Sequence, residues 1–179
     1  MRTAIVISSI PIVIAALSVG CGKSDGKPSG PRPAVQSVSE DLIMHPSPED
    51  RCPVCAMTTH DKKLPAAITL TDGRSFYFCG PGCMIRTWLD PKKNLGVDKI
   101  ALKSAVATEF YTGESVDALT ATWVAGSDVV GPMGPMPVPL ETAAKADTFK
   151  AEHGGHSFAL KEMTLEKWRS LRKGTKQPQ

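Results

Sequence analysis

The sequence predicts an α+β protein made of two small tandem β-β-α-β units with antiparallel hairpins, packed together. In each unit, two short β-prone runs flank a tight turn. A helical stretch and a further strand follow them. The helical stretches end at Pro91 and at Gly154-Gly155, residues that stop helices. Because each unit is too short to hold a good core alone, we expect the two units to pack on each other.

The chain begins with a segment typical of an export signal. Arg2 precedes an apolar run that ends at Cys21, and the small residues before Cys21 resemble a bacterial lipobox. We therefore expect residues 1–20 to be a lipoprotein signal peptide and Cys21 to carry a lipid anchor, with an ordinary signal peptide as the alternative. Residues 21–50 are rich in Ser, Gly, Lys and Pro and predict a flexible tether.

Residues 51–113 form the predicted first unit. The runs AAITLT and RSFYFC flank Asp72-Gly73, which is a strong signal for a hairpin. The stretch MIRTWLDP then predicts a short helix that Pro91 stops, and residues 104–112 predict a returning strand.

Residues 114–168 form the predicted second unit, and residues 169–179 a solvated basic tail. The runs LTATWVAG and SDVVGPM predict a hairpin around Gly126-Ser127. A helix should follow, with Thr142 near its start and Gly154-Gly155 at its end, before a closing strand in SFALKEMT.

The two units align when the chain is shifted by 54 residues. Gly80 then meets Gly134, and Cys79 meets Met133. On this alignment the loop GPMGPMPVP occupies the same structural place as CGPGCM, although the sparse identity leaves chance as an alternative.

Four cysteines besides Cys21 form two closely spaced pairs. A C-x2-C pair followed by a C-x3-C pair predicts a metal site, for which tetrahedral zinc is the usual first assignment. Disulfides are the alternative in an oxidising compartment. The candidate thiol ligands are Cys52, Cys55, Cys79 and Cys83.

Methionines accompany the thiols and change the expected metal. Met57 and Met84 follow cysteines closely, and Met133 and Met136 lie in a loop rich in Gly and Pro, where packing offers a methionine little. Thioethers suit Cu(I) and serve zinc badly, so the mixed set favours Cu(I), with Zn(II) as the alternative. For Met57 and Met84 a place in the core explains the residue equally well.

The histidines are weaker candidates. His45 lies in the expected tether and His60 follows Met57 by three residues, so either could be a plain surface residue. His153 and His156 flank the end of the second predicted helix, where a partly charged imidazole stabilises the helix terminus without any metal.

Several function classes find no support in the sequence. The formal net charge is only +3, and the C-terminal basic cluster lacks the interleaved aromatic residues of a nucleic-acid surface. The sequence contains no carboxylate pair, nucleophile elbow or phosphate loop, so we expect the protein not to be an enzyme. The alternating α/β pattern that surrounds the C-x2-C pair of an oxidoreductase is also missing.

The motif CPVCAM, a CM pair before a helix and GPMG after a second hairpin, behind a lipoprotein signal, resemble the NosL family. That family comprises periplasmic copper-binding lipoproteins associated with assembly of the copper centres of nitrous oxide reductase. The resemblance spans about residues 51–165, and its first half is also similar to a YHS/TRASH-type metal-binding module. Here Ala56 replaces the Gly of the family's usual C-P-V-C-G-M, and Cys79 and Cys83 form an additional pair.

The resemblance implies a membrane-anchored, extracytoplasmic Cu(I) metallochaperone that delivers copper to a client enzyme, nitrous oxide reductase being the family's client. An exposed methionine loop that faces a thiol cluster would hold copper and leave one position open for a partner's ligand. Two alternatives stay open: a structural zinc module that acts as an interaction adaptor, and an extracytoplasmic thiol-disulfide protein.

Overall fold

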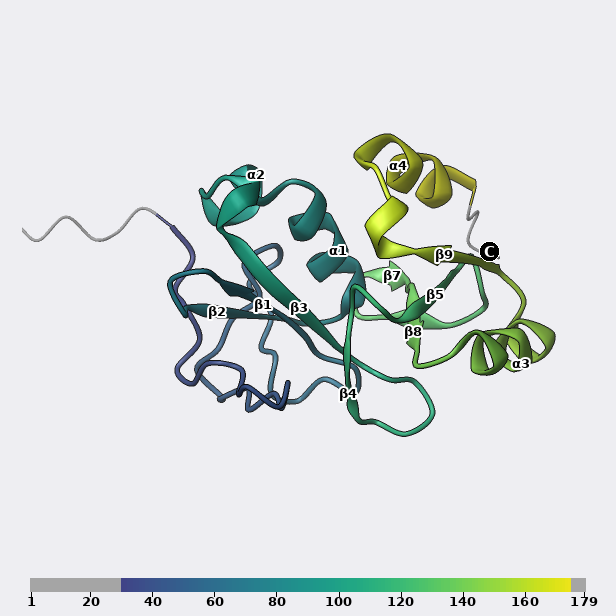
Figure 1. Cartoon of the computed structure of the whole chain (residues 1–179), viewed down its shortest axis with the longest axis horizontal. Helices are drawn as coiled ribbons and strands as arrows, with labels where there is room; N and C mark the ends of the chain where they lie inside the picture. The colour runs from purple at the N-terminus through teal and green to yellow at the C-terminus, as the bar shows by residue number, and fades with distance from the viewer. Residues whose placement is uncertain (1–29, 175–179) are drawn as a thin grey trace, which may run out of the picture.

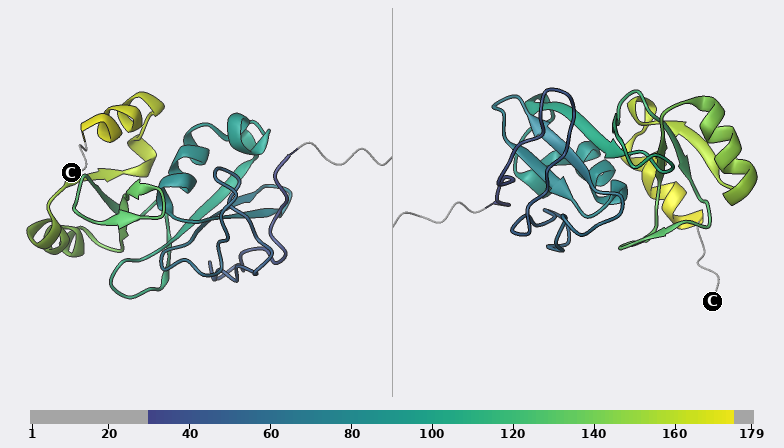
Figure 2. Two further views of the ribbon diagram at one scale, coloured as in Figure 1. Left: turned by 180° about the vertical axis from the view of Figure 1, so that it is seen from behind. Right: turned by 90° about the horizontal axis from the view of Figure 1, so that it is seen from below.

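The computed structural model describes residues 30–174 and has the predicted α+β architecture with antiparallel sheets (Figure 1). The expected signal peptide and Cys21 lie outside the described residues. The two units stand beside each other as two lobes, which Figure 2 shows from two further sides. None of the described helices has the length and apolar character that a membrane crossing requires.

The first unit contains seven short elements, the last of which, β4, lies beyond the predicted boundary at residue 113. They are β1 (Ala66–Leu70), β2 (Ser75–Phe78), α1 (Pro81–Leu89), α2 (Pro91–Leu95), the 3₁₀ turn η1 (Lys99–Ala101), β3 (Leu102–Thr108) and β4 (Ser115–Asp117). The sheet has the strand order β2-β1-β3-β4, and α1 packs on β1, β2 and β3. The predicted hairpin at Asp72-Gly73 is confirmed, since β1 and β2 pair across it. The predicted helix stop is confirmed as well, because α1 ends at Leu89 and α2 starts afresh at Pro91.

The second unit contains a smaller sheet and a separate two-stranded ribbon. Its elements are β5 (Thr122–Ala125), β6 (Val130–Gly131), β7 (Gly134–Pro135), β8 (Val138–Leu140), α3 (Ala143–His153), β9 (His156–Ala159), the 3₁₀ turn η2 (Leu160–Glu162) and α4 (Leu165–Gly174). The predicted start and end of α3 are confirmed: the Thr142 side chain accepts a hydrogen bond from the Lys145 N–H, and Gly154 ends the helix.

The β-β-α-β repeat is confirmed by the strand order. In both units two strands pair, a helix follows the second of them, and a further strand joins the free side of the first: β2-β1-β3 in one unit and β8-β5-β9 in the other. One core cluster also runs through both units, with Ile68 and Phe78 from the first and Trp123, Leu160 and Trp168 from the second. The expectation that the units pack together is therefore correct.

The predicted hairpin around Gly126-Ser127 is wrong. β5 pairs with β8, with Trp123 opposite Pro139, and the residues between them form the ribbon β6–β7. Pro132 interrupts the expected second strand, SDVVGPM, because proline has no N–H to donate. β8 tolerates Pro139 because β8 is an edge strand.

The 54-residue alignment of the two units fails for the same reason. Cys79 directly follows β2, whereas Met133 lies in the ribbon that precedes β8, the strand that corresponds to β2 in the other unit. The methionine loop and the CGPGCM segment therefore do not occupy equivalent places in the repeat.

The folded part begins earlier than the expected tether boundary. The Ala34 N–H donates to the Ser75 carbonyl at 2.8 Å, and the buried Asp50 carboxylate accepts from the Val35 N–H at 2.9 Å. The Val38 N–H also donates to the Ser75 hydroxyl and the His45 N–H to the Tyr77 hydroxyl, so residues 34–50, here called the N-terminal strap, lie along the edge strand β2.

The basic tail also begins later than expected. α4 runs to Gly174, and its Trp168 and Leu171 pack against the core that both units share. Their spacing of three residues puts both side chains on one face of the helix, so the first part of the basic segment belongs to the fold.

Candidate metal centre

Cys52 and Cys55 lie on a tight turn that directs both thiols to one side. The Cys52 carbonyl accepts from the Ala56 N–H at 2.8 Å, and the Cys52 N–H donates to the Met57 carbonyl at 2.9 Å. Ala56 closes the turn in the left-handed region, at a φ of 61°. Glycine adopts that conformation most easily, which accounts for the Gly of the family motif at this position.

Cys79 and Cys83 flank the start of α1. Cys79 directly follows the last residue of β2, and Cys83 lies in the first turn of α1. The helix begins at Pro81, three residues earlier than the sequence predicts, with Gly80 as its N-cap. Proline suits this first position because its missing N–H would have no partner there.

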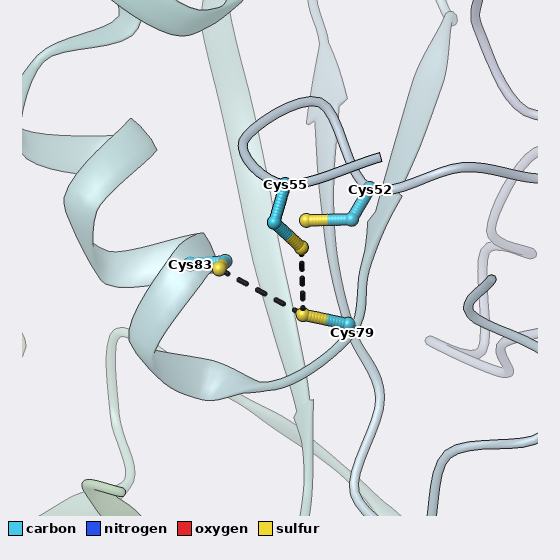
Figure 3. Close-up of side chains that lie close together, drawn as sticks. All are labelled: Cys52, Cys55, Cys79 and Cys83. Carbon is cyan, nitrogen blue, oxygen red and sulfur yellow. Dashed lines mark hydrogen bonds between the residues drawn. The ribbon is translucent and has the colours of Figure 1, made fainter. Parts of the chain in front are cut away.

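The four thiols converge from these two segments into one cluster (Figure 3). The sulfur atoms all lie within 4.8 Å of one another. The Cys79 Sγ is 3.4 Å from the Cys55 Sγ and 3.8 Å from the Cys83 Sγ, and all four cysteines are free. Four sulfurs at bond lengths of about 2.3 Å around one tetrahedral ion lie about 3.8 Å apart. The cluster therefore has the dimensions of a thiolate metal site.

The thiols share negative charge unequally. Hydrogen bonding from Cys79 and Cys83 lowers the pKa of Cys52 far below its usual value, against the opposing effect of burial. Contact with Cys52 raises the pKa of Cys79 and that of Cys83, and burial raises both further. Negative charge on Cys52 therefore opposes deprotonation of Cys79 and Cys83, because like charges repel strongly at this distance. A metal cation at the centre of the cluster would offset that repulsion and release the remaining protons.

A small pocket opens on the Cys79 and Cys83 side of the cluster. The methionine loop, residues 131–136, which includes Met133 and Met136, also lines this pocket. Its volume of about 20 Å³ leaves room for roughly one water-sized ligand. Met133 is 46% exposed and Met136 is buried. The structure thus brings both predicted methionines to the thiols by placing the inserted ribbon against the start of α1.

The other two candidate methionines have places in the core. The half-buried Met57 packs against the core that both units share, directly after the Cys52 turn. Met84 is fully buried in the same core. Packing alone accounts for both positions.

The histidines lie away from the thiol cluster, which among the described residues comprises cysteines alone. His45 and His60 are exposed. His153 is the last residue of α3, where its Nδ1 lies 2.8 Å from a carboxylate oxygen of Asp128 and its ring packs against Phe149.

The sequence did not predict the groove on the other side of the cluster. This groove includes Cys52 and Cys55 and runs between residues 49–56 and the start of the described chain, at Pro31, Arg32, Pro33 and Val35. One local signal was available: Asp50 follows Ser47 and Pro48, a pattern in which side chains bind nearby main-chain groups and order a turn.

An α+β fold with four free, converging thiols belongs to the class of small proteins whose thiol cluster suits a metal ion. Comparison with known families makes this more specific. The model of the family described as NosL matches residues 43–168, and the chain belongs to that family. NosL is a non-enzymatic family.

Individual relatives agree with the family assignment. The curated protein "Copper-binding lipoprotein NosL" of Stutzerimonas stutzeri is 25% identical over 157 residues, which cover 86% of this chain and 77% of the relative. The crystal structure of the copper chaperone NosL from Shewanella denitrificans matches with a TM-score of 0.60 and 18% identity, over 69% of this chain and 96% of that one. The second likeness supports the fold.

Proposed function

We propose that the protein is a membrane-anchored, extracytoplasmic metallochaperone that binds Cu(I) and delivers it to a copper-dependent enzyme. The observation that carries the proposal is a small pocket whose lining combines two cysteines of the thiol cluster with two methionines. Cys79, Cys83, Met133 and Met136 all contribute to that lining. Both ligand types are soft and suit Cu(I). The names of the two NosL relatives, a copper-binding lipoprotein and a copper chaperone, support this assignment of the metal.

In this proposal the thiol cluster retains the copper and the methionine loop handles its exchange. Cys52, Cys55, Cys79 and Cys83 supply thiolates, and the exposed Met133 supplies a weaker thioether that a partner's ligand can replace. The set of candidate ligands is completed by Met136 and by two methionines that lie in the core, Met57 and Met84. Nitrous oxide reductase is the client that family membership suggests.

The location proposed for the protein follows from the signal segment. Acylation of Cys21 would anchor the chain to a bacterial membrane on the extracytoplasmic side, with the folded part in the periplasm. The lipoprotein name of the Stutzerimonas stutzeri relative supports such an anchor.

One observation favours a second candidate, a structural zinc module that serves as an interaction adaptor. The sulfur–sulfur distances of 3.4 Å and 3.8 Å are close to those of a tetrahedral zinc site with four thiolates. In that case the methionine loop would have no role at the metal.

A metal competition experiment on the reduced full chain separates the two candidates. Cu(I) is titrated in the presence of a chromogenic Cu(I) chelator, with and without one equivalent of Zn(II). We expect Cu(I) to displace Zn(II), and Cys52→Ser with Cys55→Ser to lose copper to the chelator. Stoichiometric zinc binding that Cu(I) cannot displace would reject the chaperone function.

A further inference from the structure

A second, larger groove lies next to the thiol pocket. It has a volume of about 230 Å³ and is lined by residues 62–64, Phe110, residues 129–132 and Met136. Its walls are largely apolar, because Leu64 and Met136 belong to the second core cluster and Phe110 and Val129 pack against that cluster.

Exposed apolar side chains gather beside this groove. In the part of the chain that the structure describes, six large apolar residues are exposed, and three of them are Tyr111, Val130 and Met133. Val130 lies in the groove wall and is 66% exposed, and Tyr111 packs edge-on against Phe110 with ring centroids 5.2 Å apart. Such a concentration of exposed apolar surface marks an interaction site more often than a random surface does.

The charged groups in the groove lining are both positive. Lys62 and Lys63 contribute to the lining and no carboxylate does. Lys62 is paired with Asp61 at 2.8 Å, whereas the exposed Lys63 forms no ion pair with any residue that the structure describes. An occupant with carboxylates next to an apolar side chain would complement the positive charges of Lys62 and Lys63 at the rim of the groove.

Cys79 connects the groove to the proposed copper site. It lines both the groove and the small pocket between thiols and thioethers, and so do Gly131, Pro132 and Met136. A chain segment seated in the groove would therefore lie against the same loop and the same thiol through which copper would be exchanged.

We infer that this groove is the docking site for a partner protein, which inserts an apolar side chain flanked by Asp or Glu residues. The role of the partner as copper donor or acceptor rests on the proposed function, but the docking itself does not require metal. A concave groove with apolar walls fits a protruding side chain better than the broad, smooth surface of an anionic membrane, which would leave the groove unfilled.

The inference can be tested on the metal-free full chain, labelled with ¹⁵N. The probe is a synthetic peptide of about twelve residues with a central Leu-Met pair between Asp and Glu residues, long enough to fill a groove of this kind. We expect the amide signals of residues 62–64, Phe110 and residues 129–136 to shift on titration. A control peptide with Lys in place of each acidic residue should leave those signals unchanged. Vesicles of phosphatidylglycerol form a second arm.

The chain offers a matched pair of variants. Lys62→Glu with Lys63→Glu should weaken binding of the acidic peptide about fivefold or more, since it turns attraction at the rim into repulsion. Lys92→Glu with Lys93→Glu changes the charge equally on α2 and should have no effect. If the first variant does not fold, Val130→Ser at an exposed position serves in its place and should also weaken binding.

Three results would overturn the inference: no binding of the acidic peptide, equal binding of both peptides, or shifts confined to another surface. Binding to the vesicles through the groove residues without binding to the peptide would also overturn it, in favour of a membrane contact. Because no metal is present, each result is independent of whether the thiols bind Cu(I).

Discussion

Cys79 stands where three features of the molecule meet. Cys79 follows the last residue of β2, and its sulfur is in contact with those of Cys55 and Cys83. It also lines the pocket to which the methionine loop contributes. A thiol in this position can take part both in holding a metal ion and in passing it to the open side. The additional Cys79–Cys83 pair, by which the chain departs from the usual family motif, is thus central to the proposed site.

Met133 provides the residue-scale test of the proposed exchange. Met133→Leu keeps side-chain volume nearly constant, and such swaps cost less than about 1.5 kcal/mol even in a core. Since Met133 is half exposed, the fold should survive. We expect faster loss of Cu(I) to a competing chelator, because the variant lacks the thioether that we propose as an exchange ligand. The rate of transfer, measured by absorbance of the chelator complex, checks this.

Met163→Leu is the matched control for Met133. Met163 is a buried member of the core that both units share and does not line the pocket. Its substitution should leave copper transfer unchanged. If Met133→Leu transfers copper at the same rate as Met163→Leu, the methionine loop has no role at the metal, and the cysteines alone remain as candidate ligands.

At the scale of elements, the sequence predicted those that local chemistry specifies. Asp72-Gly73 demands a tight turn, and Thr142 and Gly154 mark the two ends of α3, so these features could be placed from a few neighbouring residues. The cysteine spacing likewise predicted two pairs, although only the fold shows that they converge.

The elements that the sequence missed depend on distant partners. Trp123 pairs with Pro139 across an inserted ribbon, and a pattern restricted to adjacent runs could not indicate that pairing. The N-terminal strap has the composition of a tether and is ordered by bonds to the edge of β2 and to Asp50. Long-range hydrogen bonds overrode local propensity in both cases.

Asp50 provides the element-scale test, because its carboxylate orders the strap. One oxygen accepts from the Val35 N–H at 2.9 Å and the other from the Ser47 N–H at 2.7 Å. Asp50→Ala leaves both donors without their partner, and we expect the free energy of unfolding to fall by about 1–3 kcal/mol. Hydrogen exchange measured by mass spectrometry should show faster exchange in residues 34–50.

Glu49→Ala is the control for this prediction, since Glu49 is exposed and its carboxylate forms no hydrogen bond or ion pair with the residues that the structure describes. It should leave both stability and strap exchange unchanged. Unaltered protection of residues 34–50 in Asp50→Ala would mean that the bonds to the edge of β2 order the strap without the carboxylate.

At the scale of the whole molecule, the two units are joined by a common core rather than by a linker alone. Trp168 of α4 and Trp123 of β5 belong to the same cluster as Phe78 of β2, and α4 also contacts α1. The thiol site depends on this arrangement, because the methionine loop of the second unit must rest against the start of α1 in the first. A chain whose units unfolded independently would lose that alignment.

This arrangement predicts a single cooperative unfolding transition. Removing the large side chain in Trp168→Ala should lower the free energy of unfolding by about 3–5 kcal/mol, the usual cost of such a truncation in a core. The denaturant midpoint should fall equally for both units, because the lost contacts belong to both. Alkylation of Cys52 and Cys79 reports on the first unit, and amide exchange in α3 reports on the second.

Tyr111→Ala, which removes an exposed aromatic ring, should shift both midpoints far less. If α3 loses protection at a lower denaturant concentration while the thiols stay protected, the units unfold separately and the shared core does not couple them.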